Sequence, residues 1–131
     1  MSAEAKAAAM MVGSAAVFTV RDIAASRDHY RDVLGFEITF EWGTPLHYVC
    51  MCRDHVQLHL LSAAGTRRQP GNSGLCIFVR DVDAVYAELK ARGATIAKPP
   101  ETYPYGMRDF DVLDADGNQI TYGMGVGEAE Q

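Results

Sequence analysis

The side chains that could perform acid, base or metal chemistry in this chain are few, and none of them forms a known catalytic spacing. The chain has four histidines and three cysteines. His47, His55 and Cys76 could form an improvised metal set, but a single histidine in a folded domain is more often a hydrogen-bonded core or surface residue. No G-x-S-x-G, Ser/His/Asp or Cys/His spacing indicates a nucleophile and its base.

The candidate general acids are Glu41, Glu101, Asp109 and Asp111. Asp109 and Asp111 alternate with a basic and an aromatic residue on one predicted strand, a pattern that favours a solvated or salt-bridged strand face over catalysis. No glycine-rich loop that could cradle a phosphate is present. The titratable residues therefore predict no particular reaction.

Aromatic residues are better placed for contact with a ligand. Phe40 and Trp42 share one face of a predicted strand, Tyr48 follows the next turn, and Tyr103 and Tyr105 flank a proline in a loop. Such rings stack on flat or cationic ligands, at about 0.5 to 2 kcal/mol each. Core packing explains any one ring equally well, but Trp42 and the loop tyrosines have less packing reason to be large.

An internal repeat positions these residues. The segment 18–23, FTVRDI, returns after 59 residues as IFVRDV at 77–82, and the segment 54–59 aligns with 116–121 at an offset of 62. Each half alone would be marginally stable, so we expect the halves to share one core. A site on their shared surface should draw corresponding positions from both copies.

Both copies have the same predicted order of elements. An apolar strand comes first, an aspartate caps a helix that ends at a glycine, and three strands follow. The predicted strands are 15–20, 36–42, 47–52 and 56–61 in copy one and 75–79, 95–97, 107–113 and 119–122 in copy two. We predict an α+β fold in which two tandem βαβββ modules form a curved eight-stranded mixed sheet, a cup with the helices on its outer face.

The predicted domain organisation is a single domain between two flexible tails. The divisions are a tail at 1–13, module one at 14–62, a linker at 63–73, module two at 74–124 and a tail at 125–131. The Ala-rich start lacks the layout of a signal peptide.

Composition excludes several classes of partner. A formal charge of −5 and a pI near 5.2 argue against nucleic-acid binding, which needs clustered Lys and Arg. No run of about 18 apolar residues predicts a membrane span. The odd number of cysteines in apolar runs indicates reduced thiols and a cytoplasmic protein.

The residues that close and open the two copies resemble a known family. Val20-Arg-Asp22, Tyr30 to Phe36, Tyr105 to Phe110 and Asp114-Ala-Asp-Gly-Asn118 are similar to motifs of the glyoxalase/bleomycin-resistance/extradiol-dioxygenase superfamily, which has the vicinal oxygen chelate fold. The resemblance runs from about residue 15 to residue 122. It implies the fold but not one function, because the fold hosts isomerases, dioxygenases, transferases and binding proteins.

The resemblance also implies where a metal would bind. Metal-dependent members place ligands on the first and last strand of each module, at positions that correspond to Ala15, Gly74, His59 and Thr121 here. Only His59 is a good ligand, whereas a catalytic site generally takes about three protein ligands. We therefore predict no metal and no other cofactor, and the chain is more readily interpreted as a binding protein than as an enzyme.

Within the superfamily, the motifs most resemble the metal-free bleomycin-resistance type. Its members sequester an antibiotic in grooves at the interface of a homodimer, and their closing segment has the aromatic-Gly-x-Arg-acidic-Phe form of Tyr105 to Phe110. The family often has Trp where this chain has Cys76 or Tyr105, so a planar or cationic compound other than bleomycin fits equally well. The residues predicted to bind the ligand are Phe40, Trp42, Tyr48, His59, Cys76, Phe78, Tyr103 and Tyr105.

Three functional hypotheses follow. The first is metal-independent sequestration of a small planar or cationic molecule, an antibiotic of the bleomycin type, by a homodimer. The second is a glyoxalase-like enzyme, a lyase, isomerase or dioxygenase relative, with an atypical site. The third is a binding module with a sensing or biosynthetic role. The sequence does not name the ligand.

Overall fold

Two units with the same order of elements make up the chain, which the computed structural model describes from residue 8 to residue 127. The first unit contains β1 (Ala16–Val20), α2 (Ile23–Asp32), β2 (Glu37–Trp42), β3 (Tyr48–Arg53) and β4 (Val56–Ser62). The second contains β5 (Gly74–Phe78), α3 (Val82–Ala91), β6 (Thr95–Thr102), β7 (Met107–Leu113) and β8 (Gln119–Gly125). The outer parts of the two predicted tails, 1–7 and 128–131, lie outside the described residues.

Aspartates begin both helices. The carboxylate of Asp22 accepts a hydrogen bond from the backbone N–H of Ala25, and that of Asp81 accepts one from Ala84, each at 3.0 Å. This bond satisfies one of the backbone donors that the first turn of a helix leaves free. The caps predicted from the repeated Arg-Asp pair are confirmed. No helix within residues 8–127 is long and apolar enough to cross a membrane.

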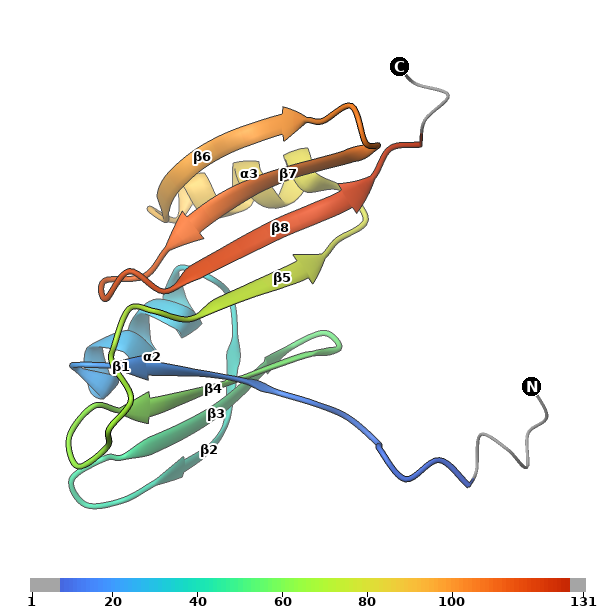
Figure 1. Ribbon diagram of the computed structural model, residues 1–131. Helices are drawn as coiled ribbons and strands as arrows, with labels where there is room; N and C mark the ends of the chain where they lie inside the picture. Colours follow the sequence, from blue (N-terminus) through green and yellow to red (C-terminus); the bar gives the residue numbers. More distant parts are fainter. Residues whose placement is uncertain (1–7, 128–131) are drawn as a thin grey trace.

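The strands of each unit form a mixed four-stranded sheet, and the two sheets have the same topology (Figure 1). Sheet one has the order β1-β4-β3-β2, and sheet two has the order β5-β8-β7-β6. The first strand of each unit pairs in parallel with the last, and the other neighbours are antiparallel. The α+β class and the two βαβββ modules are confirmed, with the eight strands hydrogen-bonded as two sheets of four.

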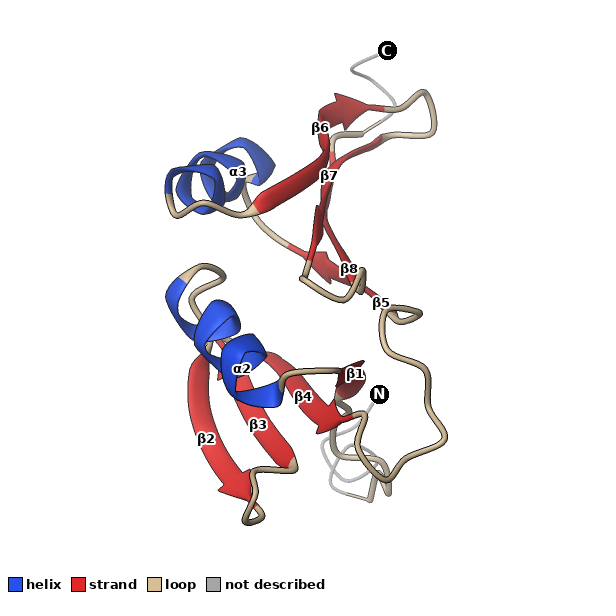
Figure 2. Ribbon diagram, turned by 90° about the vertical axis from the view of Figure 1, so that its left-hand side faces the viewer, coloured by secondary structure: helices blue, strands red, loops and turns tan. Residues whose placement is uncertain are grey.

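Each helix covers one face of its own sheet (Figure 2). In the first unit, Tyr30 of α2 meets Phe18 of β1 edge to face, with ring centroids 6.4 Å apart. In the second, Tyr86 of α3 meets Phe110 of β7 at 5.3 Å. The apolar residues of the helix-covered faces are buried and form the core. We call the face of each sheet opposite its helix the open face.

A β-bulge in β2 places Ile38 and Phe40 on opposite faces of sheet one. Ile38 pairs with Met51 and Phe40 pairs with Cys50, so the register shifts between them. Ile38 therefore packs on the core beside Phe36, whereas Phe40 lies on the open face. Unbroken alternation over the predicted strand 36–42 would put Ile38 and Phe40 on one face, but the extra residue of a bulge changes which face the chain presents.

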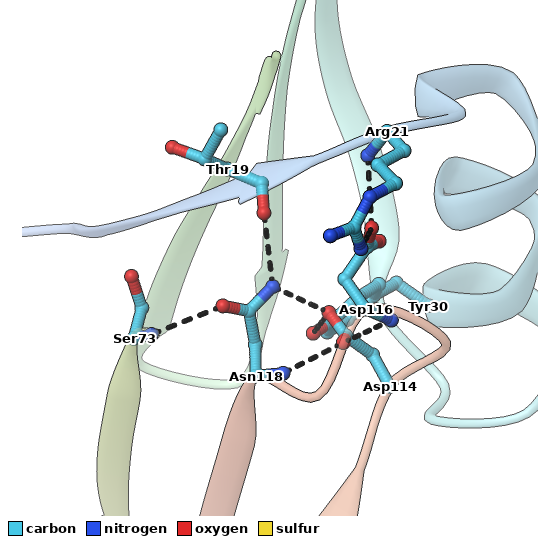
Figure 3. Close-up of polar contacts among 7 residues, drawn as sticks. All are labelled: Thr19, Arg21, Tyr30, Ser73, Asp114, Asp116 and Asn118. Atoms are coloured by element: carbon cyan, nitrogen blue, oxygen red, sulfur yellow. Dashed lines mark hydrogen bonds and ion pairs between the residues drawn. The ribbon is translucent and has the colours of Figure 1, made fainter. Parts of the chain in front are cut away.

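A buried carboxylate joins the second unit to the first (Figure 3). Asp114, at the end of β7, accepts a hydrogen bond from the hydroxyl of Tyr30 on α2, at 2.9 Å. It also accepts hydrogen bonds from the backbone N–H groups of Asp116 and Asn118 and from Nδ2 of Asn118, each at 2.9 Å. Burial without partners would be costly for a carboxylate, so these four bonds make the hairpin between β7 and β8 a rigid element.

Asn118 bridges three parts of the chain from a position that is only 1% exposed. Its Nδ2 also donates to the carbonyl of Thr19 in β1 at 3.1 Å, and its Oδ1 accepts the N–H of Ser73 at 3.1 Å. On the surface beside it, Arg21 pairs with Asp116 at 3.1 Å. Asp114 and Asn118 are residue types common in turns, but the structure shows that here they fasten the two units together.

Candidate functional site

Four of the predicted ligand-binding residues lie together on the open face of sheet one. Trp42 and Tyr48 are cross-strand partners in β2 and β3, and His59 lies opposite Cys50 on β4. The hydroxyl of Tyr48 is 2.7 Å from Nδ1 of His59, and the rings meet edge to face at 5.3 Å. Burial raises the pKa of Tyr48, so its hydroxyl stays protonated at neutral pH. This hydrogen bond fixes the orientation of the His59 ring.

The two rings of β2 project from this face into solvent. Phe40 is 53% exposed and Trp42 is 61% exposed. Trp42 has one ring neighbour, His47, at 6.4 Å. Large exposed aromatic rings at one end of a sheet are unusual on a monomer surface and indicate a contact surface.

The other four predicted residues lie in the second unit. Cys76 and Phe78 point to the same side of β5, and Phe78 is 75% exposed. Its partner in β8 is Gly123, which has no side chain to cover the Phe78 ring. Burial raises the pKa of the Cys76 thiol, and the nearby Asp109 and Asp111 raise it further. The thiol is therefore protonated and weakly nucleophilic at neutral pH.

Tyr103 and Tyr105 form a stacked pair in the loop between β6 and β7. Their ring centroids are 5.2 Å apart and the planes differ by 10°. The ammonium of Lys98 lies 5.0 Å from the Tyr103 ring and 2.8 Å from Asp109. Tyr105 is 66% exposed, so its outer ring face is free to stack on a planar group.

Three of the four candidate acids, Glu41, Asp109 and Asp111, are engaged by neighbours. Asp109 pairs with Lys98, as the salt-bridged strand face predicts, and Glu41 pairs with Arg27 at 2.7 Å. Asp111 accepts a hydrogen bond from the hydroxyl of Thr121 at 2.7 Å.

The residues present do not fit a superfamily metal site. Gly74 offers no side chain, the Thr121 hydroxyl donates to Asp111, and His59 uses Nδ1 for Tyr48. Within residues 8–127, no three His, Cys, Asp or Glu side chains are close enough to hold an ion. We therefore derive no metal-dependent step for this chain.

The structure brings four of the eight predicted residues together on sheet one. The other four belong to the second unit, where Cys76 and Phe78 lie on the edge strand β5 and Tyr103 and Tyr105 follow β6, the strand at the opposite edge of sheet two. Within the described part of the chain, no hydrogen bond or ring contact joins the group on sheet one to the group in the second unit. A cavity of about 830 Å³ lies elsewhere, at the junction of the two units. Of the eight residues only Phe78 lines it. The sequence analysis did not predict this cavity, although the two copies of the internal repeat differ in residue type at positions that line it.

Comparisons with known proteins agree with this arrangement. The family model described as Glyoxalase/Bleomycin resistance protein/Dioxygenase superfamily matches residues 13–122. No curated protein matches the chain. A member of the same superfamily from Sphaerobacter thermophilus DSM 20745 is 30% identical, with a TM-score of 0.76 over 88% of this chain and 98% of that one.

Two other solved structures are antibiotic-binding proteins. The bleomycin-binding protein of bleomycin-producing Streptomyces verticillus, complexed with copper(II)-bleomycin, is 27% identical, with a TM-score of 0.72 over 92% of this chain and 99% of that one. TnmS3, an antibiotic binding protein from Streptomyces sp. CB03234, is 26% identical, with a TM-score of 0.70 over 89% and 99%. With its paired βαβββ modules and a family match over most of its length, the chain belongs to the glyoxalase/bleomycin resistance protein/dioxygenase superfamily.

Proposed function

We propose that this protein sequesters a small planar or cationic molecule, an antibiotic of the bleomycin type, in grooves of a homodimer and without a metal. The observation that carries the proposal is the exposure of four large rings, Phe40, Trp42, Phe78 and Tyr105, which are 53 to 75% exposed. A monomer has no packing reason to present these rings on open strand faces and a loop. Their exposure is explained if a ligand and a second chain cover them.

Stacking supports a planar ligand. The Tyr103–Tyr105 pair presents the free face of Tyr105, and Gly123 leaves the Phe78 ring uncovered on the neighbouring strand. A planar group between two such rings gains about 0.5 to 1.5 kcal/mol per ring beyond the area it buries. Three or four rings would thus add about 1.5 to 6 kcal/mol, compared with about 8 kcal/mol for a micromolar affinity.

Charge supports a cationic ligand. The open face of sheet two carries Asp109 and Asp111, and Lys98 pairs only with Asp109. Asp111 forms no ion pair with any residue of the described range, and its neighbour Thr121 is uncharged. One negative charge therefore remains on this face, and it would attract a cation more than an anion.

The separation of the two ring groups supports a homodimer. One group lies on sheet one and the other belongs to the second unit, and no hydrogen bond or ring contact joins them within residues 8–127. A second copy that places its second unit opposite sheet one would bring both groups to one groove, and two-fold symmetry would create two such grooves. The similarity to a bleomycin-binding protein and to an antibiotic binding protein supports an antibiotic as the ligand.

Fluorescence of the single tryptophan tests the proposal. Bleomycin titrated into the protein should quench Trp42, and a hundredfold excess over the dissociation constant should raise the unfolding free energy by about 2.7 kcal/mol. Tyr105→Ala should weaken binding by about 1 kcal/mol with little change in melting temperature, because the exposed ring contributes little to the core. Thr95→Ala, exposed at the other end of β6, is the matched control. An absence of quenching and of stabilisation, with bleomycin and with a planar cationic dye alike, would refute the proposal.

The Tyr48–His59 pair favours an enzyme as the second candidate. A hydroxyl hydrogen-bonded to imidazole at 2.7 Å on an open face is an arrangement that can transfer a proton. If the chain were such an enzyme, His59→Gln would abolish turnover of a bound substrate without loss of binding. If it is a sequestering protein, the bound compound is recovered chemically unchanged from both wild type and variant.

A further inference from the structure

The two junctions between the units of this chain should be alike by internal symmetry, but only one is filled. At the filled junction, Arg21 pairs with Asp116, and Asn118 and Tyr30 form the buried network of Figure 3. The offsets of 59 and 62 residues give Arg80 and Asp54 as the counterparts of Arg21 and Asp116. Both counterparts line the cavity of about 830 Å³, and no ion pair joins them in the described structure.

The sequence explains why the second junction stays open. The counterpart of Asn118 is Val56, and that of Tyr30 is Leu89. Neither can provide the amide or the hydroxyl that fastens the first junction, and Val56 itself lines the cavity. The loss of polar partners leaves an apolar hollow of the size that small-molecule sites usually have.

Tyr122 supplies an unused donor inside this hollow. The residue is 5% exposed, lines the cavity, and makes no hydrogen bond through its hydroxyl to any residue of 8–127. By contrast, the other deeply buried tyrosine, Tyr30, donates to Asp114. The fully buried side-chain atoms without a partner in residues 8–127 are His29 Nε2 and Glu88 Oε2, so the Tyr122 hydroxyl is still reached by solvent and is free to hydrogen-bond to a ligand in the cavity. Burial raises the pKa of Tyr122, which keeps the hydroxyl a donor throughout the neutral range.

Three side chains that line the cavity, Arg53, Arg80 and Tyr122, can donate hydrogen bonds to a ligand. The guanidinium of Arg53 is held by the carbonyl of Leu34 at 3.0 Å and by Glu88 at 2.8 Å, so it is fixed beside the cavity with N–H groups to spare. Arg80, on the rim, forms no ion pair with any described residue. The acidic groups are less available, since Asp81 caps α3 and Asp54 lies exposed at a hairpin tip.

We propose that this junction cavity is a second binding site, distinct from the aromatic open faces, for a small apolar carboxylic acid. The carboxylate would accept hydrogen bonds from Tyr122 and Arg80, and the apolar body would lie on Phe36, Ile77 and Val85. A carboxylate fits because the guanidinium groups of Arg53 and Arg80 can only donate hydrogen bonds, and the Tyr122 hydroxyl can donate one as well. Nothing in this proposal requires the antibiotic-binding function.

Titration with 2-naphthoate tests the site, with backbone amide NMR shifts to locate it. Binding should shift the amides of Arg53 to Val56 and of Phe78 to Asp81. Tyr122→Phe, which keeps the ring stacked on Phe110 at 5.2 Å, should weaken binding about fivefold by the loss of one hydrogen bond. Arg80→Gln should weaken it similarly, and 2-naphthamide, which has no charge, should be insensitive to that change.

Arg21→Gln is the matched control, because it alters the corresponding arginine at the filled junction and should leave the affinity for 2-naphthoate unchanged. Melting curves confirm that each variant is folded, and the exposed Arg80 can be replaced without loss of core packing. The proposal is overturned if 2-naphthoate does not bind, if its shifts map to Trp42 and Tyr105, or if Arg80→Gln and Tyr122→Phe bind as well as Arg21→Gln does. Bleomycin titrated in parallel reports on the open faces separately.

Discussion

Replacement of Asn118 by alanine tests how the two units are held together. The side chain is 1% exposed and makes hydrogen bonds to Thr19, Ser73 and Asp114. Asn118→Ala leaves the Thr19 carbonyl and the Ser73 N–H without their partners and removes one of the four bonds to the buried carboxylate. Each deprived buried group costs about 1 to 3 kcal/mol, and water that enters the vacated space recovers part of this.

We therefore expect the unfolding free energy to fall by about 3 kcal/mol. The measurement is urea unfolding followed by circular dichroism, with the midpoint lowered and the slope unchanged. For a domain of this size the melting temperature should fall by roughly 10 °C. Asn72→Ala is the matched control, since it makes the same truncation on an exposed residue of the linker and should change stability by less than about 0.5 kcal/mol. Equal stabilities of the two variants would refute the account of the junction.

Three further predictions concern charge, thiol chemistry and assembly. The Arg53 guanidinium lowers the pKa of Glu88, so the stability from this pair is present above the ordinary glutamate pKa and is lost as the pH falls through the lower folded value. The unfolding free energy should therefore fall less between pH 7 and pH 3 in Glu88→Gln than in the wild type. An identical fall in both proteins would contradict this. Because the pKa of Cys76 is raised, Ellman's reagent should modify it more slowly at pH 7.5 than it modifies free glutathione, and equal rates would contradict this. At micromolar concentration the chain should sediment as a dimer that Trp42→Glu weakens, whereas a single 14.3 kDa species would exclude the homodimer.

Much of the fold could be predicted from the repeat. The Arg-Asp pairs at 21–22 and 80–81 marked the end of a strand and the cap of a helix, and both signals are local, so they do not depend on the rest of the chain. Alternation along β2 gives the wrong face for Phe40 relative to Ile38, because the bulge between them depends on the pairing of β2 with β3. Local propensity thus gave the elements, and their partners decided which side chain faces where.

The junction contacts could not be predicted in the same way. Asp114 and Asn118 are typical turn residues, and their bonds to Tyr30 and Thr19 span 84 and 99 positions of sequence. No local pattern distinguishes a turn that fastens two units from one that only reverses the chain. Residues that share an open face were easier to predict, because alternation along a strand shows which side chains point to the same side as Trp42 or Phe78. Alternation cannot show whether the faces of two separate sheets meet.

A crystal structure of the protein grown with bleomycin tests the central claim most directly. The account predicts a homodimer with planar ligand density in a groove that has Trp42 and Phe40 of one protomer on one wall and Phe78 and Tyr105 of its partner on the other, and no metal ion bound by protein side chains. Ligand density away from these four rings, or a groove closed by side chains in a dimer that leaves the rings in solvent, would contradict it.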